Sequence, residues 1–191
     1  MPIDVIASNA ALVVIDLQVG VTQGIETFPH SVDTVVDNAS RLVEAFHDSN
    51  RPVVFVTVWY GPNNELQPHM PCEAPMNFAP PAGWNELDPR FDVHADDIHI
   101  VKPAVSSFFG TDLDVQLSRR GIGSIVVVGI ATNIGGEGTV RSGYDRGYHQ
   151  VVVSDAMSAT SGELHEHTMH NVFPMMANIA STDDVIRALQ G

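Results

Sequence analysis

One segment constrains the fold more than any other. It runs from Ser124 to Tyr148 and reads SIVVVGIATNIGGEGTVRSGYDRGY. Residues 125–128 form a short β-branched apolar run between two glycines, which is typical of a buried strand. A polar turn at 131–133 follows, and then an expected helix whose first turns hold Gly135, Gly136 and Gly138. Because a glycine inside a helix costs about 1 kcal/mol relative to alanine, bare backbone is needed there. It serves either close helix–strand packing or a ligand at the helix N-terminus, where free N–H groups favour negative charge.

The rest of the chain alternates strand and helix patterns. Residues 11–15 are continuously apolar, the pattern of a strand buried on both faces, and apolar residues recur at helical spacing over 31–48. A helix is expected to start with Thr111 as its cap, and further strands are expected at 53–58, 98–101, 151–153 and 176–180. These elements predict an α/β fold. We expect a single domain over residues 1–191, with a doubly wound, mostly parallel sheet of about six strands and helices on both faces.

Composition excludes several classes of protein. The formal net charge of −14 argues against nucleic-acid and anionic-membrane partners. No apolar run approaches the roughly 18 residues of a membrane span, and the N-terminus lacks a charged stretch followed by an apolar one. A soluble, cytoplasmic protein is therefore expected. Cys72 is the only cysteine, which excludes an internal disulfide and a multi-cysteine metal site.

A proline-rich segment interrupts the alternation between about residues 61 and 90. Seven of the twelve prolines lie between Pro62 and Pro89. A loop of about thirty residues inside a compact domain is uncommon and usually functional, so we expect it to cover a pocket or a subunit interface, with Trp84 as an anchor. Its apolar side chains also favour a homo-oligomer, a dimer or higher, because a partner could cover them. They are Leu66, Met70, Met76, Phe78 and Trp84.

Two charged residues follow strands at positions where a ligand could bind. Asp16 comes directly after the run at 11–15, with Gln18 close behind it, and Lys102 ends the strand at 98–101. The carboxyl ends of parallel strands lie at one edge of an open α/β sheet, where such folds bind ligands. Lys102 is also the only lysine among nine basic residues, and an ammonium differs from a guanidinium in size, hydration and ease of pKa shift. Taken alone, Asp16 could equally begin a turn.

Two motifs resemble those of a known family. Residues 129–141, G-I-A-T-N-I-G-G-E-G-T-V-R, resemble the signature of the isochorismatase-like hydrolases, which include nicotinamidases and N-carbamoyl amidohydrolases. That signature is commonly G-x-A-T-(D/N)-x-C-V-x-x-T-A-R, with the cysteine as nucleophile. Lys102 and the S-S-F-F-G-T-D-L that follows at 106–113 are similar to a strand-ending lysine before S-x-F-x-G-T-x-L in the same family. The resemblance covers about residues 11–160, and it puts Gly135 at the position of the nucleophile.

The resemblance implies roles for the residues that match. In the cysteine hydrolases an aspartate, here Asp16, takes the thiol proton, and a lysine, here Lys102, steadies the charges. Two backbone N–H groups hold the oxyanion. Carried over, these are the N–H groups of Ala131 and Gly135, with an expected cis peptide between Ile130 and Ala131. Cys72 does not replace the missing nucleophile, because it falls in the proline-rich segment.

Isochorismatases proper also carry glycine at the nucleophile position. They cleave a vinyl ether, and their aspartate protonates the substrate carbon, so Asp16 would have to be protonated before turnover. Burial would raise its pKa and Lys102 would lower it, and the sequence leaves the outcome open. The chain departs from the isochorismatase pattern, which has histidine, glycine and cysteine near Asn133, Gly135 and Gly136, and a glutamine-bearing segment at residues 58–60. This chain resembles a cysteine-less branch whose substrate is a separate question.

We therefore predict a hydrolase that acts on a small metabolite through the Asp16–Lys102 pair, without a cysteine nucleophile and with no cofactor. The reaction is cleavage of a vinyl ether, or of another C–O bond or a C–N bond. The alternative is a non-catalytic relative that retains the pocket for ligand binding or assembly. The residues expected to form the oxyanion hole or bind substrate are Ala131, Gly135, Asn133, Gln18, Trp59 and Phe108.

A metal site is not predicted. His167 and His170 are three residues apart and could share a helix face, but a third ligand is not evident in the sequence. Metal-binding nicotinamidases use an Asp-x-His arrangement that residues 59–70 do not show. We expect these histidines to face solvent or pack.

Overall fold

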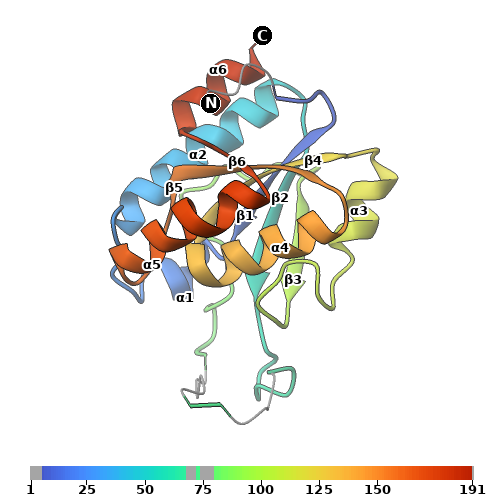
Figure 1. Cartoon of the computed structure of the whole chain (residues 1–191). Coiled ribbons are helices and arrows are strands. Elements are labelled where there is room, and N and C mark those ends of the chain that lie inside the picture. Colours follow the sequence, from blue (N-terminus) through green and yellow to red (C-terminus); the bar gives the residue numbers. More distant parts are fainter. Residues whose placement is uncertain (1–5, 68–71, 74–79, 191) are drawn as a thin grey trace.

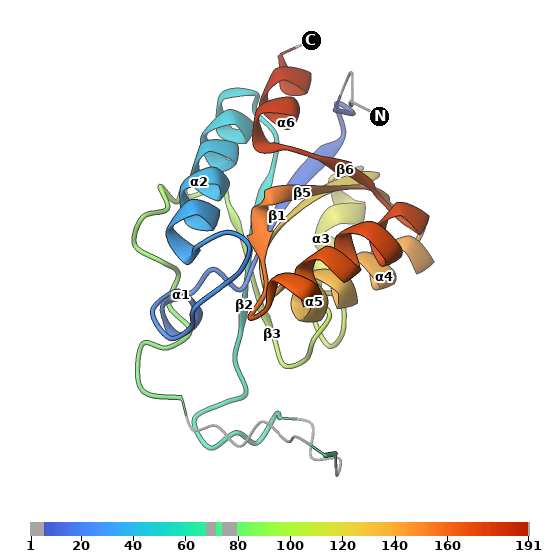
Figure 2. The same ribbon diagram turned by 60° about the vertical axis from the view of Figure 1, so that its left-hand side comes forward.

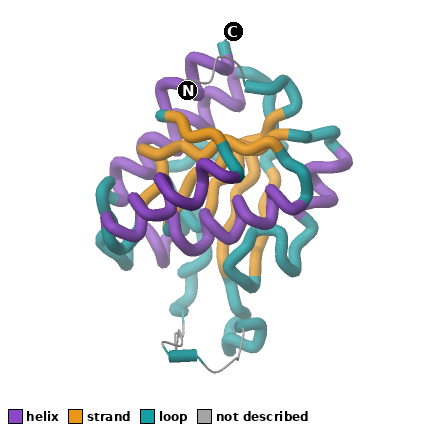
Figure 3. The backbone as a smooth tube through the Cα atoms, in the orientation of Figure 1, coloured by secondary structure: helices purple, strands orange, loops and turns teal. Residues whose placement is uncertain are grey.

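The computed structural model describes residues 6–67, 72–73 and 80–190, and within these ranges it has one six-stranded sheet (Figures 1 and 3). All neighbouring strands pair in parallel, in the order β3-β2-β1-β4-β5-β6. The strands are β1 (Ala10–Ile15), β2 (Val53–Val58), β3 (Ile98–Lys102), β4 (Ser124–Ile130), β5 (His149–Ser158) and β6 (Asn178–Ala180). The predicted α/β class, the six strands and the parallel pairing are confirmed.

Helices cover both faces of the sheet (Figure 2). One face packs against α2 (Val32–Asp48) and α6 (Thr182–Leu189). The other packs against α3 (Leu113–Arg119), α4 (Glu137–Asp145) and the irregular turns η2 (Thr168–Val172) and η3 (Phe173–Met175). The remaining elements are α1 (Val19–Thr22), η1 (Thr132–Gly136) and α5 (Gly162–His167). None of the helices in the described ranges is long and apolar enough to cross a membrane.

The central strand β1 shows why the apolar run at 11–15 lacks alternation. Leu12 and Val14 join the core under α2 and α6, whereas Val13 and Ile15 join the core under α3 and α4. Because both faces are covered, every residue of β1 is buried. The α2 helix begins after Ser31, whose hydroxyl accepts a hydrogen bond from the Thr34 N–H, and this agrees with the predicted helix at 31–48.

Several predicted boundaries are wrong. The strand expected at 151–153 extends to Ser158, because β5 shifts its register on β4 and pairs again beyond the irregularity. The N-cap of α3 is Asp112, which makes no side-chain capping hydrogen bond, so the predicted cap position is one residue off. The Thr111 hydroxyl nevertheless accepts from the N–H of Leu113, the first residue of α3, at 3.3 Å, and it donates to the Ser107 carbonyl oxygen at 2.6 Å. The strand expected at 176–180 is shorter, because η3 extends through Met175 and β6 begins only at Asn178.

The chain order places a ligand site at one point of the sheet edge. From β1 the chain builds outward to β2 and β3, and it then returns to β4 on the opposite side of β1. Open α/β sheets bind ligands beside the carboxyl ends of the strands where the strand order reverses. In this chain that point lies between the ends of β1 and β4. The described parts of residues 61–90, which hold no helix or strand, leave the sheet at the same edge (Figures 1 and 2).

Candidate active site

Asp16 and Lys102 form a buried ion pair at this edge. The Lys102 Nζ lies 2.9 Å from the Asp16 Oδ2, with 2% and 9% of the two side chains exposed. Asp16 directly follows β1 with a left-handed φ of 56°, and its N–H donates to the Val56 carbonyl oxygen at 2.8 Å. Lys102 ends β3, two strands from β1, so its long side chain must span the end of β2. The predicted proximity of the two residues is confirmed.

The pair is only partly satisfied by the protein. The Lys102 ammonium also donates to the Val105 carbonyl oxygen at 2.7 Å, whereas the Asp16 Oδ1 is buried and has no hydrogen-bond partner among the described residues. Burial of the carboxyl raises the pKa of Asp16 from its usual 3.8 to about 6, although the Lys102 ammonium opposes the shift. Between the two effects that the sequence left open, burial is therefore the larger. A carboxyl with this pKa can exist in either protonation state near neutral pH.

Glycine is needed at the three positions after β4 for different structural reasons. A Cβ on Gly136 would lie 2.5 Å from the Met157 Cε, and one on Gly138 would lie 2.7 Å from a methyl carbon of Val105. These two glycines permit close packing. A Cβ on Gly135 would instead lie 2.8 Å from the Asp16 Oδ2 and 3.2 Å from the Lys102 Nζ. Gly135 therefore lies directly against the ion pair, at the place where the family signature has its cysteine.

The turn between β4 and α4 carries the other signature residues. The peptide bond between Ile130 and Ala131 is cis, as the resemblance implied. The Ala131 carbonyl oxygen accepts hydrogen bonds from the N–H groups of Ile134 and Gly136, both at 3.1 Å, which holds the turn. Asn133 lies two residues before Gly135, and its Oδ1 is buried with no hydrogen-bond partner in the part of the chain that the structure describes. The turn thus supplies a second unsatisfied acceptor at this edge.

Two residues expected to bind substrate make contacts within the fold. The Gln18 amide donates to the carbonyl oxygens of Val58 and Trp84 and accepts from the Val58 N–H at 2.7 Å, so it ties the end of β2 and the proline-rich segment to β1. Phe108 is buried in the core, where its ring stacks on Tyr148 and lies under the Arg146 guanidinium. Both residues are buried in these contacts.

Trp59 and Tyr60 follow β2 at the same edge. Trp59 is partly buried, and its N–H donates to the Lys102 carbonyl oxygen at 3.0 Å. The Tyr60 side chain, which was not predicted to belong to the site, is buried. Burial raises the pKa of its phenol, and the negative charge of Asp16 raises it further. Its position just beyond a strand end is the same signal that selected Asp16 and Lys102.

The histidines of α5 and η2 do not form a metal centre with their neighbours. His165 is buried, and its Nδ1 lies 2.9 Å from the Thr132 Oγ1, so it supports the turn before Gly135. His167 and His170 are exposed, and His170 pairs with Glu166. Among the described residues, no group of three or more His, Cys, Asp or Glu side chains is arranged to hold a metal ion.

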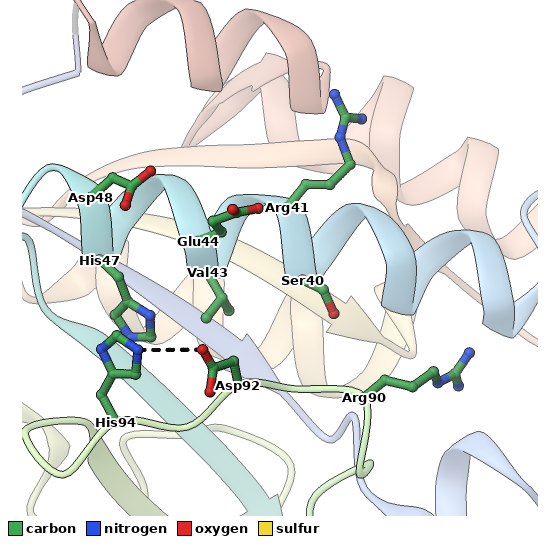
Figure 4. A pocket seen from close by; sticks show the side chains of 9 residues that line it. All are labelled: Ser40, Arg41, Val43, Glu44, His47, Asp48, Arg90, Asp92 and His94. Atoms are coloured by element: carbon green, nitrogen blue, oxygen red, sulfur yellow. Dashed lines mark ion pairs between the residues drawn. The ribbon is translucent and has the colours of Figure 1, made fainter.

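A separate hollow lies along α2, away from the strand ends (Figure 4). It encloses about 460 Å³ between α2 and the segment 90–94, and its lining includes neither Asp16 nor Lys102. At one end the His47 and His94 rings stack with centroids 3.7 Å apart, and His94 faces Asp92 at 3.5 Å. The hollow is distinct from the site at the carboxyl edge.

Comparison with known proteins gives one consistent family. Residues 10–184 match the model of the isochorismatase domain. The isochorismatase family protein YecD of Escherichia coli is 37% identical over 187 residues, which cover 96% of this chain and 97% of YecD. A solved isochorismatase family protein from Burkholderia thailandensis superposes with a TM-score of 0.94 at 37% identity, covering 99% of this chain and all of the other. The ureidoacrylate amidohydrolase RutB of Acinetobacter baylyi is 37% identical over 110 residues, 56% of this chain and 45% of RutB.

Proposed function

The chain belongs to the isochorismatase family of hydrolases, and from this premise we propose that it hydrolyses a small metabolite with the Asp16–Lys102 pair and without a cysteine nucleophile. The observation that carries the proposal is the contact of Gly135 with a buried, half-satisfied ion pair. A carboxylate with a raised pKa beside a cation is a common arrangement for general acid–base catalysis. Cys72 is exposed and belongs to the proline-rich segment, so no thiol enters the mechanism.

The bond we favour is the C–N bond of an amide, because amidohydrolases are among the relatives. Ionised Asp16 takes a proton from a water molecule, and the hydroxide forms a bond to the carbonyl carbon. The Lys102 ammonium and the N–H groups of Ala131 and Gly135 stabilise the resulting oxyanion. When the C–N bond breaks, Asp16 returns the proton to the leaving nitrogen. The products are a carboxylic acid and an amine, and Asp16 is ionised again.

A second candidate is acid-catalysed cleavage of a vinyl ether. It is favoured by the pKa of Asp16, which burial raises to about 6, because this mechanism begins with a protonated carboxyl. Asp16 would then protonate the vinyl carbon, and water would add to the resulting cation and return a proton to Asp16. Breaking the C–O bond of the hemiketal, with its hydroxyl proton passing to the leaving oxygen, gives a carbonyl compound and an alcohol. The two candidates differ in the protonation state of Asp16 that reacts, so they predict opposite pH dependences.

Turnover of a panel of small amides, ureides and vinyl ethers, with ureidoacrylate included, tests the proposal. At least one compound should be hydrolysed by the parent, and Asp16→Asn should lose about 10²–10⁴-fold of that rate. Asp37→Asn is the matched control, since it removes an exposed carboxylate from α2. A folded Asp16→Asn variant with the parental rate would contradict the assigned role. A parent that binds compounds from the panel without turning over any of them would favour the alternative of a non-catalytic relative.

We also propose that the chain forms a homo-oligomer. Of the residues that motivated this prediction, Met70, Met76 and Phe78 lie outside the described ranges. Other apolar side chains support it near β3, which is an edge strand, since 53% of Val101 and 68% of Phe109 are exposed. Light scattering should give a mass above the 20.6 kDa of one chain, and Phe109→Asp should lower it. A 20.6 kDa species throughout the micromolar range would contradict the proposal.

A further inference from the structure

The turn that carries Gly135 has little stability of its own. η1 is a single wide turn of five residues, two of which are glycines, and its N-cap is Ala131, which makes no side-chain hydrogen bond. A glycine in a helix costs about 1 kcal/mol relative to alanine, and an isolated turn fixes several backbone angles for few hydrogen bonds. Contacts with other parts of the fold must therefore hold the turn in place.

The segment formed by α5 and η2 contacts this turn at both of its ends. The His165 Nδ1 lies 2.9 Å from the Oγ1 of Thr132, the first residue of η1. The Thr168 hydroxyl donates at 3.1 Å to the Oε2 of Glu137, the residue directly after η1. Residues three apart share one face of a helix, and α5 lies beside α4 in both views (Figures 1 and 2). The two contacts thus bracket Gly135.

The contact between Thr132 and His165 does not provide a substitute nucleophile. A hydroxyl within hydrogen-bond reach of a histidine is an arrangement that covalent catalysis uses. Here Thr132 is 0% exposed and His165 is 3% exposed, so the hydroxyl is not accessible to a substrate. A buried hydroxyl needs a hydrogen-bond partner, and the imidazole supplies one. The contact therefore holds the turn in place.

We propose that His165 is a positioning residue, which holds the backbone N–H groups of the turn against the buried ion pair. Its contact with Thr132 fixes the residue directly after Ala131, and Ala131 and Gly135 carry the two N–H groups that we assign to the oxyanion. Such donors are effective because they are in place before the reaction. A loosened turn would keep both donors but would no longer aim them. The inference rests on the proposed function in taking these N–H groups as the oxyanion donors.

The surroundings of His165 favour its neutral form. Burial lowers the pKa of the imidazole, and positive charge on His30 lowers it further. The His30 ring meets the His165 ring edge-on, with the centroids 5.9 Å apart. His170 adds to the lowering and Glu166 opposes it, whereas η1 carries no ionisable side chain. A neutral imidazole has one donor and one acceptor, so in either tautomer it can form a hydrogen bond with the Thr132 hydroxyl.

Hydrogen exchange of single amides tests the inference without turnover. The Gly136 N–H donates to the Ala131 carbonyl oxygen at 3.1 Å, and in His165→Leu its exchange should become at least about tenfold faster. The exchange of the Val13 N–H, in the centre of β1, should change much less, because the expected effect is local opening of the turn. His167→Leu is the matched control. It makes the same replacement at an exposed position of α5, and it should leave the exchange at Gly136 unchanged.

Variants that change only the hydrogen bond separate positioning from packing. Thr132→Val keeps the volume of the side chain but lacks the hydroxyl, so it should accelerate exchange at Gly136 as His165→Leu does. It gives the same test should His165→Leu not fold. His165→Asn, whose amide can reach the position of the imidazole Nδ1, should restore most of the parental protection. The double variant Thr132→Val/His165→Leu should exchange no faster than either single variant, because both remove the same bond.

Turnover gives the second measurement. On a substrate from the panel, His165→Leu should lower kcat about tenfold or more and leave KM within about twofold, because the aimed donors act on the transition state. Parental exchange at Gly136 in a folded His165→Leu or Thr132→Val variant would overturn the inference. So would an equal acceleration at Gly136 and Val13, or an unchanged kcat in a variant whose turn is loosened. A parent that turns over no compound would contradict the proposed function, and hydrogen exchange would still decide whether His165 holds the turn.

Discussion

Asp16 and Asp88 are two buried carboxylates, each paired with a cation, whose pKa values move in opposite directions. They are 7% and 3% exposed. The backbone N–H and the Nε of Arg90 donate to the Asp88 Oδ1 at 3.1 Å and 2.8 Å. The Arg90 Nη2 donates to the Asp88 Oδ2 at 2.8 Å. These hydrogen bonds lower the pKa of Asp88 to about 2. Within the described ranges the Asp16 carboxylate pairs only with Lys102, and burial raises its pKa to about 6.

The difference separates an ion pair with a structural role from the pair that we propose to be reactive. Asp88 has both oxygens satisfied by a forked guanidinium that is 37% exposed, so the charged form is stable and inert. Asp16 has one oxygen unsatisfied and a partner that is 2% exposed. Its charged form is costly until something else donates to it. The Asp88 carboxylate is thus fully paired by Arg90, whereas among the described residues no donor reaches the Asp16 Oδ1.

Replacing the cation of the Asp16 pair should have the largest effect after that of Asp16→Asn. Lys102→Arg keeps the charge, but the larger planar guanidinium should displace Asp16 and lower turnover at least about tenfold. Arg119→Lys, an exchange of the same two side chains at an exposed position in the last turn of α3, should have no effect. Steady-state kinetics on any substrate from the panel would measure both. Activity of Lys102→Arg within about twofold of the parent would mean that any nearby positive charge is sufficient.

A thiol at position 135 would report the field of the pair. In Gly135→Cys the new side chain lies beside Lys102, which favours the thiolate. Alkylation by iodoacetamide at mildly acidic pH should be about tenfold faster than at Cys72, which is exposed in the same molecule. The Asp16 carboxylate must move slightly, because a Cβ would lie 2.8 Å from its Oδ2. Circular dichroism, with Gly135→Ala as the control for added volume, checks that the fold survives. An introduced thiol that reacts like Cys72 would contradict an activating pocket.

The pH dependence of kcat/KM distinguishes the two proposed mechanisms. If Asp16 acts as the base in amide hydrolysis, the rate should rise about tenfold per pH unit up to about 6 and then level off. If it acts as the acid on a vinyl ether, the rate should fall above the same pH. A profile that is flat between about pH 4 and 8 would remove Asp16 from either role.

The Asp88–Arg90 pair should affect the free energy of unfolding and not the rate of turnover, and the expected effect is small. The pKa of Asp88 is depressed from 3.8 to about 2, so its contribution is present above the unfolded pKa and is lost as pH falls through about 2. Asp88→Asn should lower the free energy of unfolding by about 1–2 kcal/mol at neutral pH, reduced by the solvent exposure of Arg90. In urea unfolding, the difference in free energy of unfolding between Asp88→Asn and the parent should shrink below about pH 4. A gap that does not change with pH would contradict the ion-pair explanation.

For Asp16, the free energy of unfolding should change with pH in the opposite direction in the same urea experiment. Its folded pKa is raised, so the folded state binds more protons than the unfolded one between about pH 4 and 6. Ionisation of Asp16 therefore reduces stability as pH rises through that window, and Asp16→Asn should remove this part of the decrease. Retention of the full decrease in the variant would assign it to other groups.

The sequence predicts the meeting of Asp16 and Lys102 because strand ends in a parallel sheet share one edge. It also predicts the place of Gly135, because the signature is continuous in the chain. It could not predict the role of Gln18, whose partners Val58 and Trp84 are 40 and 66 residues away. Phe108 matched a motif but packs in the core. The unsatisfied Asp16 Oδ1 depends on tertiary geometry, which residue types and spacing do not encode locally.

Carboxyl ¹³C titration by NMR tests the central claim most directly, with Asp16→Asn and Asp88→Asn assigning the two resonances. The account predicts that Asp16 titrates at about 6 and Asp88 at about 2 in the same molecule. An Asp16 that titrates at or below its usual 3.8 would show that Lys102 already satisfies it, and the distinction between the two pairs would be wrong.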